Sequence, residues 1–166
     1  MCEAVRLLAR RCRVVAISTF YRTEAIPPTQ PPFIDGVVAL ETDLSPRELK
    51  LGVLREIEER LGRVRTSDRN APRPIDCDLL LLGDRVVREP DLVLPSPDVL
   101  ERSFVAQALL ELDRSLTLPG SRTTLADAAA RMPRRPMEAL PELTSALRRE
   151  LEEAEDESRT HRRARS

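Results

Sequence analysis

One segment constrains the fold of this chain more than any other, the apolar run from Ile75 to Leu82. It follows two prolines that bar a helix, it is rich in residues that suit a strand, and Gly83 ends it. We therefore predict a short β-strand that opens with Asp76 and Asp78. Side chains alternate along a strand, so these two carboxylates should share one face, with their Cα atoms roughly 7 Å apart.

Two carboxylates at this spacing can hold one or two Mg²⁺ ions when phosphate oxygens and water complete the coordination shell. The preceding arginines can bind the phosphates, because guanidinium groups pair with phosphate oxygens bidentately and stay ionised. These arginines are Arg63, Arg65, Arg69 and Arg73. The chain lacks the GxxxxGK and GxGxxG patterns, so arginine must bind any nucleotide. Composition alone favours a solvated loop here, whereas the paired aspartates before four consecutive leucines favour a phosphate and metal site.

Composition bounds the remaining possibilities. A chain of 166 residues suits one domain. The net charge of −1, with 33% of residues charged, argues against a nucleic acid or a membrane surface as the main partner. The three cysteines, Cys2, Cys12 and Cys77, show no metal-ligand spacing, and an odd number suits a reducing cytoplasm. No apolar run is long enough to span a bilayer.

Hydrophobic periodicity predicts the other elements. Ser45 begins a capping box with proline next to it, and Gly62 closes the helix that follows. Glu58 lies on this helix, where a solvated position is the simpler expectation and a contact with an arginine is the alternative. The remaining expected elements are a helix over 2–11, strands over 13–21 and 33–42, a proline-rich loop over 22–32, a hairpin over 85–94 and an amphipathic helix over 141–155.

The segment from Gly62 to Gly83 resembles the signature of the 6-hydroxymethyl-7,8-dihydropterin pyrophosphokinase family. The G-R-x-R turn, the W-G-P-R loop and the D-x-D strand of that family stand here as GRVR at 62–65, NAPR at 70–73 and DCD at 76–78. The resemblance extends from about Cys12 to Leu125. It implies a transferase that moves a pyrophosphoryl group from ATP to 6-hydroxymethyl-7,8-dihydropterin in folate biosynthesis and releases AMP.

The resemblance also implies an α+β fold, a ferredoxin-like sandwich whose mainly antiparallel sheet is covered by helices. Members of the family begin earlier, with a strand and a G-S-N-like turn, and this first strand is missing here. We expect a truncated start, which would expose the edge of a neighbouring strand or leave it to another element to cover. The expected organisation is a pterin pyrophosphokinase-like domain over 1–132, an appended amphipathic helix over 133–157 that packs on the domain or a partner, and a disordered basic tail over 158–166.

Site residues follow from the same resemblance. Two Mg²⁺ ions would be held by Asp76 and Asp78, and the catalytic arginines would be Arg63 and Arg73. ATP would be bound by Arg65, Arg69, Arg73, Leu79, Ser96 and Arg102. The pterin would be bound by Thr23, Phe33, Asp35, Asn70 and Phe104.

Several positions depart from the family pattern. Asn70 replaces a tryptophan that closes over the pterin, Ser96 replaces a nucleotide-contacting histidine, and Asp35 replaces an asparagine. The metal pair and the main arginines are retained, so we expect an active but divergent enzyme. The alternatives are a ferredoxin-like module that binds nucleotide without turnover, and a structural protein that binds a partner through its C-terminal helix.

Overall fold

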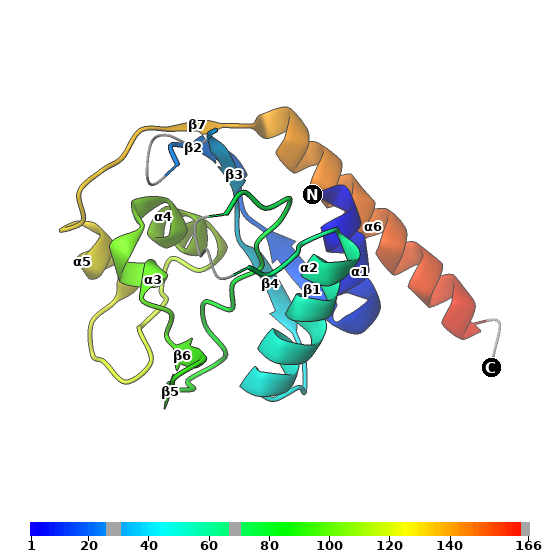
Figure 1. Ribbon diagram of the computed structural model, residues 1–166, viewed down its shortest axis with the longest axis horizontal. Helices are drawn as coiled ribbons and strands as arrows, with labels where there is room; N and C mark the ends of the chain where they lie inside the picture. The colour runs from blue at the N-terminus through cyan, green and yellow to red at the C-terminus, as the bar shows by residue number, and fades with distance from the viewer. Residues whose placement is uncertain (26–30, 67–70, 164–166) are drawn as a thin grey trace.

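The computed structural model describes residues 1–25, 31–66 and 71–163, with side chains up to residue 153. Short antiparallel strands lie between two groups of helices (Figure 1). One group contains α1 (Cys2–Arg11), α2 (Arg55–Arg60) and α6 (Pro141–Arg163). The other contains α3 (Asp98–Glu101), α4 (Ser103–Leu112) and α5 (Leu125–Ala129). The predicted α+β class is therefore confirmed. None of the helices in the described ranges combines the length and the hydropathy that crossing a bilayer requires.

The sequence predicted one strand over 13–21 and another over 33–42. Each of these stretches forms two shorter strands instead. The observed strands are β1 (Arg13–Ile17), β2 (Tyr21–Thr23), β3 (Phe33–Asp35) and β4 (Val38–Glu41). β1 pairs with β4, and β2 pairs with β3, in both cases antiparallel. The prediction of two continuous strands is wrong, because the chain bends between the β1–β4 pair and the β2–β3 pair.

Gly36 and Phe20 explain the bend. A Cβ atom on Gly36 would lie 2.6 Å from the Phe20 ring, a separation that real Cβ atoms essentially never show. The buried ring therefore occupies the space that a side chain would need. Ser18 bridges the two halves, since its Oγ accepts a hydrogen bond of 2.9 Å from the backbone N–H of Val37. The bend turns β3, with Phe33 and Asp35, into a separate sheet from β4.

The helix predicted between Ser45 and Gly62 forms, and its first part is π-helical. The Ser45–Glu48 capping box is present: the Ser45 N–H donates to the Glu48 carboxylate at 2.8 Å, and the Glu48 N–H donates to Ser45 Oγ at 3.3 Å. A π-helical segment, η1 (Glu48–Leu54), precedes α2. An apolar stripe of this helix is buried at Leu49, Val53, Leu54 and Ile57. Gly62 then adopts φ of +89°, which suits glycine and turns the chain toward the arginines.

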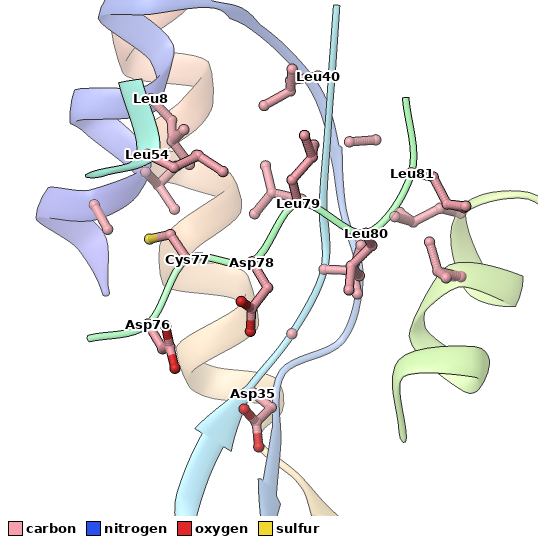
Figure 2. Close-up of a pocket in the computed structure, with 18 of the residues that line it drawn as sticks. Leu8, Asp35, Leu40, Leu54, Asp76, Cys77, Asp78, Leu79, Leu80 and Leu81 are labelled. Atoms are coloured by element: carbon pink, nitrogen blue, oxygen red, sulfur yellow. The ribbon is translucent and has the colours of Figure 1, made fainter. Parts of the chain in front are cut away.

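The segment Ile75–Leu82 does not form the predicted strand. It carries no ladder within the described residues, although its side chains alternate as those of a strand do. Ile75, Cys77 and Leu79 pack on the core beneath α1 and η1, and Leu80 packs on the core around α4. β4 runs beside this segment (Figure 2), but among the described residues it pairs only with β1.

The last third of the chain joins the same body. A hairpin of β5 (Val87–Glu89) and β6 (Leu92–Leu94) lies in the predicted range. The sequence analysis missed β7 (Met137–Ala139), which pairs with β2. Helix α6 is longer than predicted and lies against α1 (Figure 1), with Leu147 fully buried. The apolar stripe of α6 therefore packs within this chain.

Candidate active site

The two aspartates of the signature lie on the same side of their segment. Figure 2 shows Asp76 and Asp78 pointing in the same direction, toward Asp35, while Cys77 points the opposite way. This follows from the alternation of an extended backbone, because Cys77 between them packs on the core. The expected shared face is therefore observed, even though the segment has no strand ladder.

Glu58 anchors the arginine turn and contradicts its predicted solvated position. Its side chain is only 3% exposed, and one carboxylate oxygen accepts hydrogen bonds from Arg63 and from the backbone N–H of Cys77, the latter at 2.8 Å. The other oxygen pairs with Arg65 at 2.5 Å. Burial raises the pKa of Glu58, while the Cys77 N–H and the two arginines oppose that rise. One carboxylate thus joins the helix, the turn and the aspartate segment.

The sequence held a signal for this role. Glu58 follows Leu54 by four residues and Ile57 by one, which places it at the edge of the buried stripe. A carboxylate at such a position is buried when cations can reach it, and two arginines follow the helix.

Asp76 is the second point at which the arginines converge. Arg63, whose side chain is 11% exposed, bridges Glu58 and Asp76. The Nε atom of Arg73 lies 2.8 Å from the other carboxylate oxygen of Asp76. The carboxylate of Asp76 is therefore neutralised from two sides by the arginines predicted to be catalytic.

A cavity of about 220 Å³ brings the predicted residues together. Predicted site residues that line it are Phe33, Asp35, Arg73, Asp76, Asp78, Arg102 and Phe104. The sequence analysis missed Asp98, which also lines the cavity and accepts a 2.8 Å hydrogen bond from Arg102 Nε. Its spacing of four residues from Arg102 on a helical pattern was the available signal. The cavity thus combines two aromatic rings with carboxylates and guanidinium groups.

Burial and neighbouring charges both act on the carboxylates of the cavity. Burial raises the pKa of Asp78, and the nearby Asp76 and Asp98 raise it further. Burial also raises the pKa of Asp35, although a 2.5 Å hydrogen bond from Thr23 Oγ1 opposes this. A cation at the cavity would relieve the repulsion between these carboxylates. Among the described residues no three acidic, cysteine or histidine side chains converge on one point, so a metal ion here would need further oxygen ligands from outside the chain's described part.

Other predicted residues lie outside the cavity lining. Leu79 packs on the core beneath α1, and Leu80 lines the cavity instead. Ser96 donates its N–H to the Leu80 carbonyl at 2.8 Å and so fixes the end of the aspartate segment. Thr23 reaches the site through Asp35, and Arg65 through Glu58. The predictions for Arg69 and Asn70 lie outside the described residues.

Comparisons with known proteins show the family to which the chain belongs. Residues 1–114 match the family model for 7,8-dihydro-6-hydroxymethylpterin-pyrophosphokinase. The chain is similar to three proteins named 2-amino-4-hydroxy-6-hydroxymethyldihydropteridine pyrophosphokinase. The relative from Pseudomonas aeruginosa is 39% identical over 130 residues, 78% of either chain. The relative from Haemophilus influenzae is 37% identical over 110 residues, 66% of this chain and 68% of the relative. The relative from Synechocystis is 39% identical over 108 residues, 65% of this chain, and only 54% of its own length is covered.

Proposed function

We propose that this chain, which belongs to the 7,8-dihydro-6-hydroxymethylpterin-pyrophosphokinase family, transfers the pyrophosphoryl group of ATP to 6-hydroxymethyl-7,8-dihydropterin. The reaction would release AMP and serve folate biosynthesis. The observation that carries the proposal is the cavity that gathers the aspartates, Arg73, Arg102 and two phenylalanine rings. We place the reaction in the cytoplasm, which suits three cysteines that are all free.

Mg²⁺ is the ion that the site residues fit. Asp76 and Asp78 offer hard oxygen donors on one face, and Mg²⁺ prefers oxygen ligands completed by phosphate and water. We propose that these two residues hold two Mg²⁺ ions together with the triphosphate of ATP. The metal would supply charge neutralisation at the phosphates.

The arginines would change partners when the nucleotide binds. In the structure Arg63 and Arg73 both pair with the carboxylate of Asp76. We propose that Asp76 turns to the metal while both arginines turn to phosphate oxygens. Every charge would remain paired throughout this exchange, which matters because an unpaired buried charge is costly. Arg65 and Arg102 would add further contacts to the nucleotide.

The pterin would occupy the aromatic end of the cavity. Phe33 and Phe104 line it, and flat heterocycles stack on such rings. Asp35 can accept hydrogen bonds from the amino and ring N–H groups of a pterin, and Thr23 holds its carboxylate in place. The substrate hydroxymethyl group would then lie toward Asp76 and Asp78.

The transfer itself needs positioning more than acid or base chemistry. The hydroxymethyl oxygen forms a bond to the β-phosphorus of ATP, and the bond between that phosphorus and the oxygen bridging to the α-phosphate breaks. AMP leaves with the bridging oxygen, and the hydroxyl proton passes to water. Arg63 and Arg73 would stabilise the charge that develops on the transferred group.

Formation of AMP tests the proposal. The full chain is incubated with ATP, Mg²⁺ and 6-hydroxymethyl-7,8-dihydropterin, and AMP is measured by chromatography. We expect pterin-dependent AMP that falls at least about 100-fold in Asp76→Asn, because a lost charge contact in the transition state has that magnitude. Asp84→Asn, the same substitution at an exposed turn, should retain activity. Binding of ATP without AMP would instead identify a nucleotide-binding module, and full activity in Asp76→Asn would overturn the assigned roles.

A further inference from the structure

The start of α6 holds the backbone where the chain bends from β1 into β2. β7 pairs with β2 and leads into α6 (Figure 1). This pairing continues beyond the strands, because the Leu140 N–H donates to the Phe20 carbonyl at 2.8 Å. The Phe20 N–H donates to Thr144 Oγ1 at 2.9 Å. Both backbone hydrogen-bonding groups of Phe20 are therefore paired with residues at the start of α6.

The Thr144 hydroxyl is suited to this contact. The residue is only 4% exposed, and its O–H donates to the Leu140 carbonyl at 2.9 Å, which leaves the oxygen lone pairs free to accept from Phe20. Valine has nearly the same shape and carries no acceptor, so it would leave the Phe20 N–H unpaired. An unpaired N–H in the interior is costly, and the bend would have to move to pair it again.

The ring of Phe20 connects the bend to the candidate active site. A Cβ atom on Gly36 would lie 2.6 Å from this ring, so the ring packs directly on the Gly36 backbone. Gly36 lines the cavity of about 220 Å³ beside Asp35. We call the part of this cavity lined by Phe33, Asp35 and Gly36 the substrate wall. Direct contacts thus lead from α6 through Phe20 to the substrate wall.

The bend is also attached to the opposite side of the cavity. The Thr19 N–H donates to the Glu111 carboxylate at 2.7 Å, and the Tyr21 hydroxyl donates to the same carboxylate. Glu111 belongs to α4, the helix that carries Phe104 at its other end. The position of the bend therefore sets how far the substrate wall lies from the Phe104 ring.

We propose that Thr144 is a positioning residue for the substrate wall: it holds Phe20, and Phe20 holds the backbone that presents Asp35 to the pterin. This inference rests on the proposed function and adds to it a residue that contacts no substrate. Thr144 lies outside residues 1–114, the part of the chain that matches the family model.

The nucleotide end of the cavity is supported by other elements. Glu58 on α2 holds Arg63, and Arg63 and Arg73 pair with Asp76. Loss of the contact between α6 and the bend should therefore weaken binding of the pterin and spare binding of ATP.

Steady-state kinetics of the full chain test this separation. We expect Thr144→Val to raise the KM for 6-hydroxymethyl-7,8-dihydropterin at least about 10-fold, because small misplacements of positioning groups have large effects. The KM for ATP should stay within about twofold, since distant sites act independently. Thr144→Ser keeps the hydroxyl and should restore the pterin KM. Equal increases in both KM values, or an unchanged pterin KM, would overturn the proposal.

A second measurement follows the substrate wall without turnover. The chain has five glycines, so labelling with ¹⁵N-glycine gives a simple amide spectrum. We expect Thr144→Val to shift the Gly36 resonance and to leave those of Gly52 and Gly62 in place. An unshifted Gly36 resonance would overturn the proposal. If the unsubstituted chain formed no AMP, the proposed function would fail, and the Gly36 resonance would still show whether Thr144 positions the wall.

Two further variants separate positioning from general loss of stability. Glu150→Gln breaks the 2.5 Å ion pair between α6 and Arg6, away from the bend, and should change neither the pterin KM nor the Gly36 resonance. Phe20→Leu keeps the backbone groups that bond to α6 and removes the ring. It should raise the pterin KM as Thr144→Val does, and the double variant should raise it no further, because the two residues act in series. Additive increases would contradict the proposal, and if Thr144→Val does not fold, an unchanged pterin KM in Phe20→Leu would do so.

Discussion

At the scale of single residues, the site depends on one buried carboxylate. Glu58 contacts Arg63, Arg65 and the backbone of Cys77, so it sets where the turn meets the aspartate segment. Burial of a carboxylate is costly unless cations and hydrogen bonds compensate, and here both do. Its contribution is mainly positional, because it holds the arginines beside Asp76.

Glu58→Ala should destabilise the fold strongly. The substitution removes two ion pairs from Arg63 and Arg65 and a hydrogen bond to the aspartate segment, and it leaves the mostly buried Arg63 with Asp76 alone. We expect a loss of about 3 kcal/mol in the free energy of unfolding, measured by urea denaturation. Glu59→Ala, at the neighbouring exposed residue paired with Arg55, should cost less than about 0.5 kcal/mol. Equal effects of the two substitutions would contradict the anchoring role.

Asp35→Asn should stabilise the protein at neutral pH. Burial raises the pKa of Asp35 in the folded state above its unfolded value, so the ionised form is disfavoured by folding. This penalty is present above the folded pKa and disappears as pH falls to the unfolded pKa. We expect Asp35→Asn to raise the free energy of unfolding at pH 7 by up to about 1 kcal/mol, and the difference from the unsubstituted chain to vanish near pH 4.

Asp113→Asn provides a control of opposite sign. Hydrogen bonds from the Ser115 hydroxyl and backbone N–H lower the pKa of Asp113, so its ionised form favours folding. Thermal unfolding measured between about pH 4 and pH 7 should show that Asp113→Asn is less stable than the unsubstituted chain at pH 7. If both substitutions changed stability in the same direction, the electrostatic explanation would fail.

At the scale of elements, the bend at Gly36 separates β3 from β4 and so places Phe33 and Asp35 at the cavity. Gly36→Ala should destabilise the fold by about 1–3 kcal/mol, because the new methyl group would overlap the Phe20 ring. Gly52→Ala is the matched control. A Cβ at Gly52 meets no atom within 4 Å, so alanine should stabilise the helix by about 0.5–1 kcal/mol. Thermal unfolding of both variants measures the contrast, and stabilisation by Gly36→Ala would refute the packing explanation.

Local patterns predicted the helices better than the strands. The capping box at Ser45, the buried stripe of the central helix and the alternation of Asp76 and Asp78 depend on neighbours in sequence, and all are observed. The breaks in the two long strands depend on Phe20 meeting Gly36, a contact between residues far apart in sequence. The ladder at Ile75–Leu82 fails for a similar reason, because an apolar run predicts a strand but not its partner.

The candidate site residues were likewise predicted where motifs in the sequence identify them and missed where tertiary contacts decide their position. The aspartates, the arginines and the phenylalanines were predicted from the family resemblance, and seven predicted residues line one cavity. Asp98 was missed because its helix approaches the cavity only through tertiary packing. We predicted a solvated Glu58 because a helical pattern alone does not show whether arginines will reach a carboxylate at the edge of the buried apolar stripe.

At the scale of the whole molecule, the C-terminal helix belongs to the core. Leu147 on α6 is fully buried, and Arg6 pairs with Glu150 at 2.5 Å. Arg148 also donates hydrogen bonds to the Ile17 carbonyl at the end of β1, the shorter at 2.9 Å. The helix therefore stabilises α1 and the β1–β4 pair, and through them the wall that faces the aspartate segment.

Leu147→Ala should destabilise the whole molecule by about 2–5 kcal/mol, because it leaves a cavity in the core between α6 and α1. Unfolding should remain a single transition when it is followed both by circular dichroism and by hydrogen exchange in α1. Leu100→Ala, at an exposed leucine, should change stability by less than about 0.5 kcal/mol. A separate early transition confined to α6 would show that the helix is only appended.

The most direct test of the central claim is the fate of the β-phosphorus of ATP. The full chain is given ATP labelled on that phosphorus, together with Mg²⁺ and 6-hydroxymethyl-7,8-dihydropterin, and the products are separated. We predict that the label moves to the pterin with one AMP released for each product, and that Asp78→Asn abolishes this transfer. Label that remains in ADP, or transfer that persists in Asp78→Asn, would contradict the account.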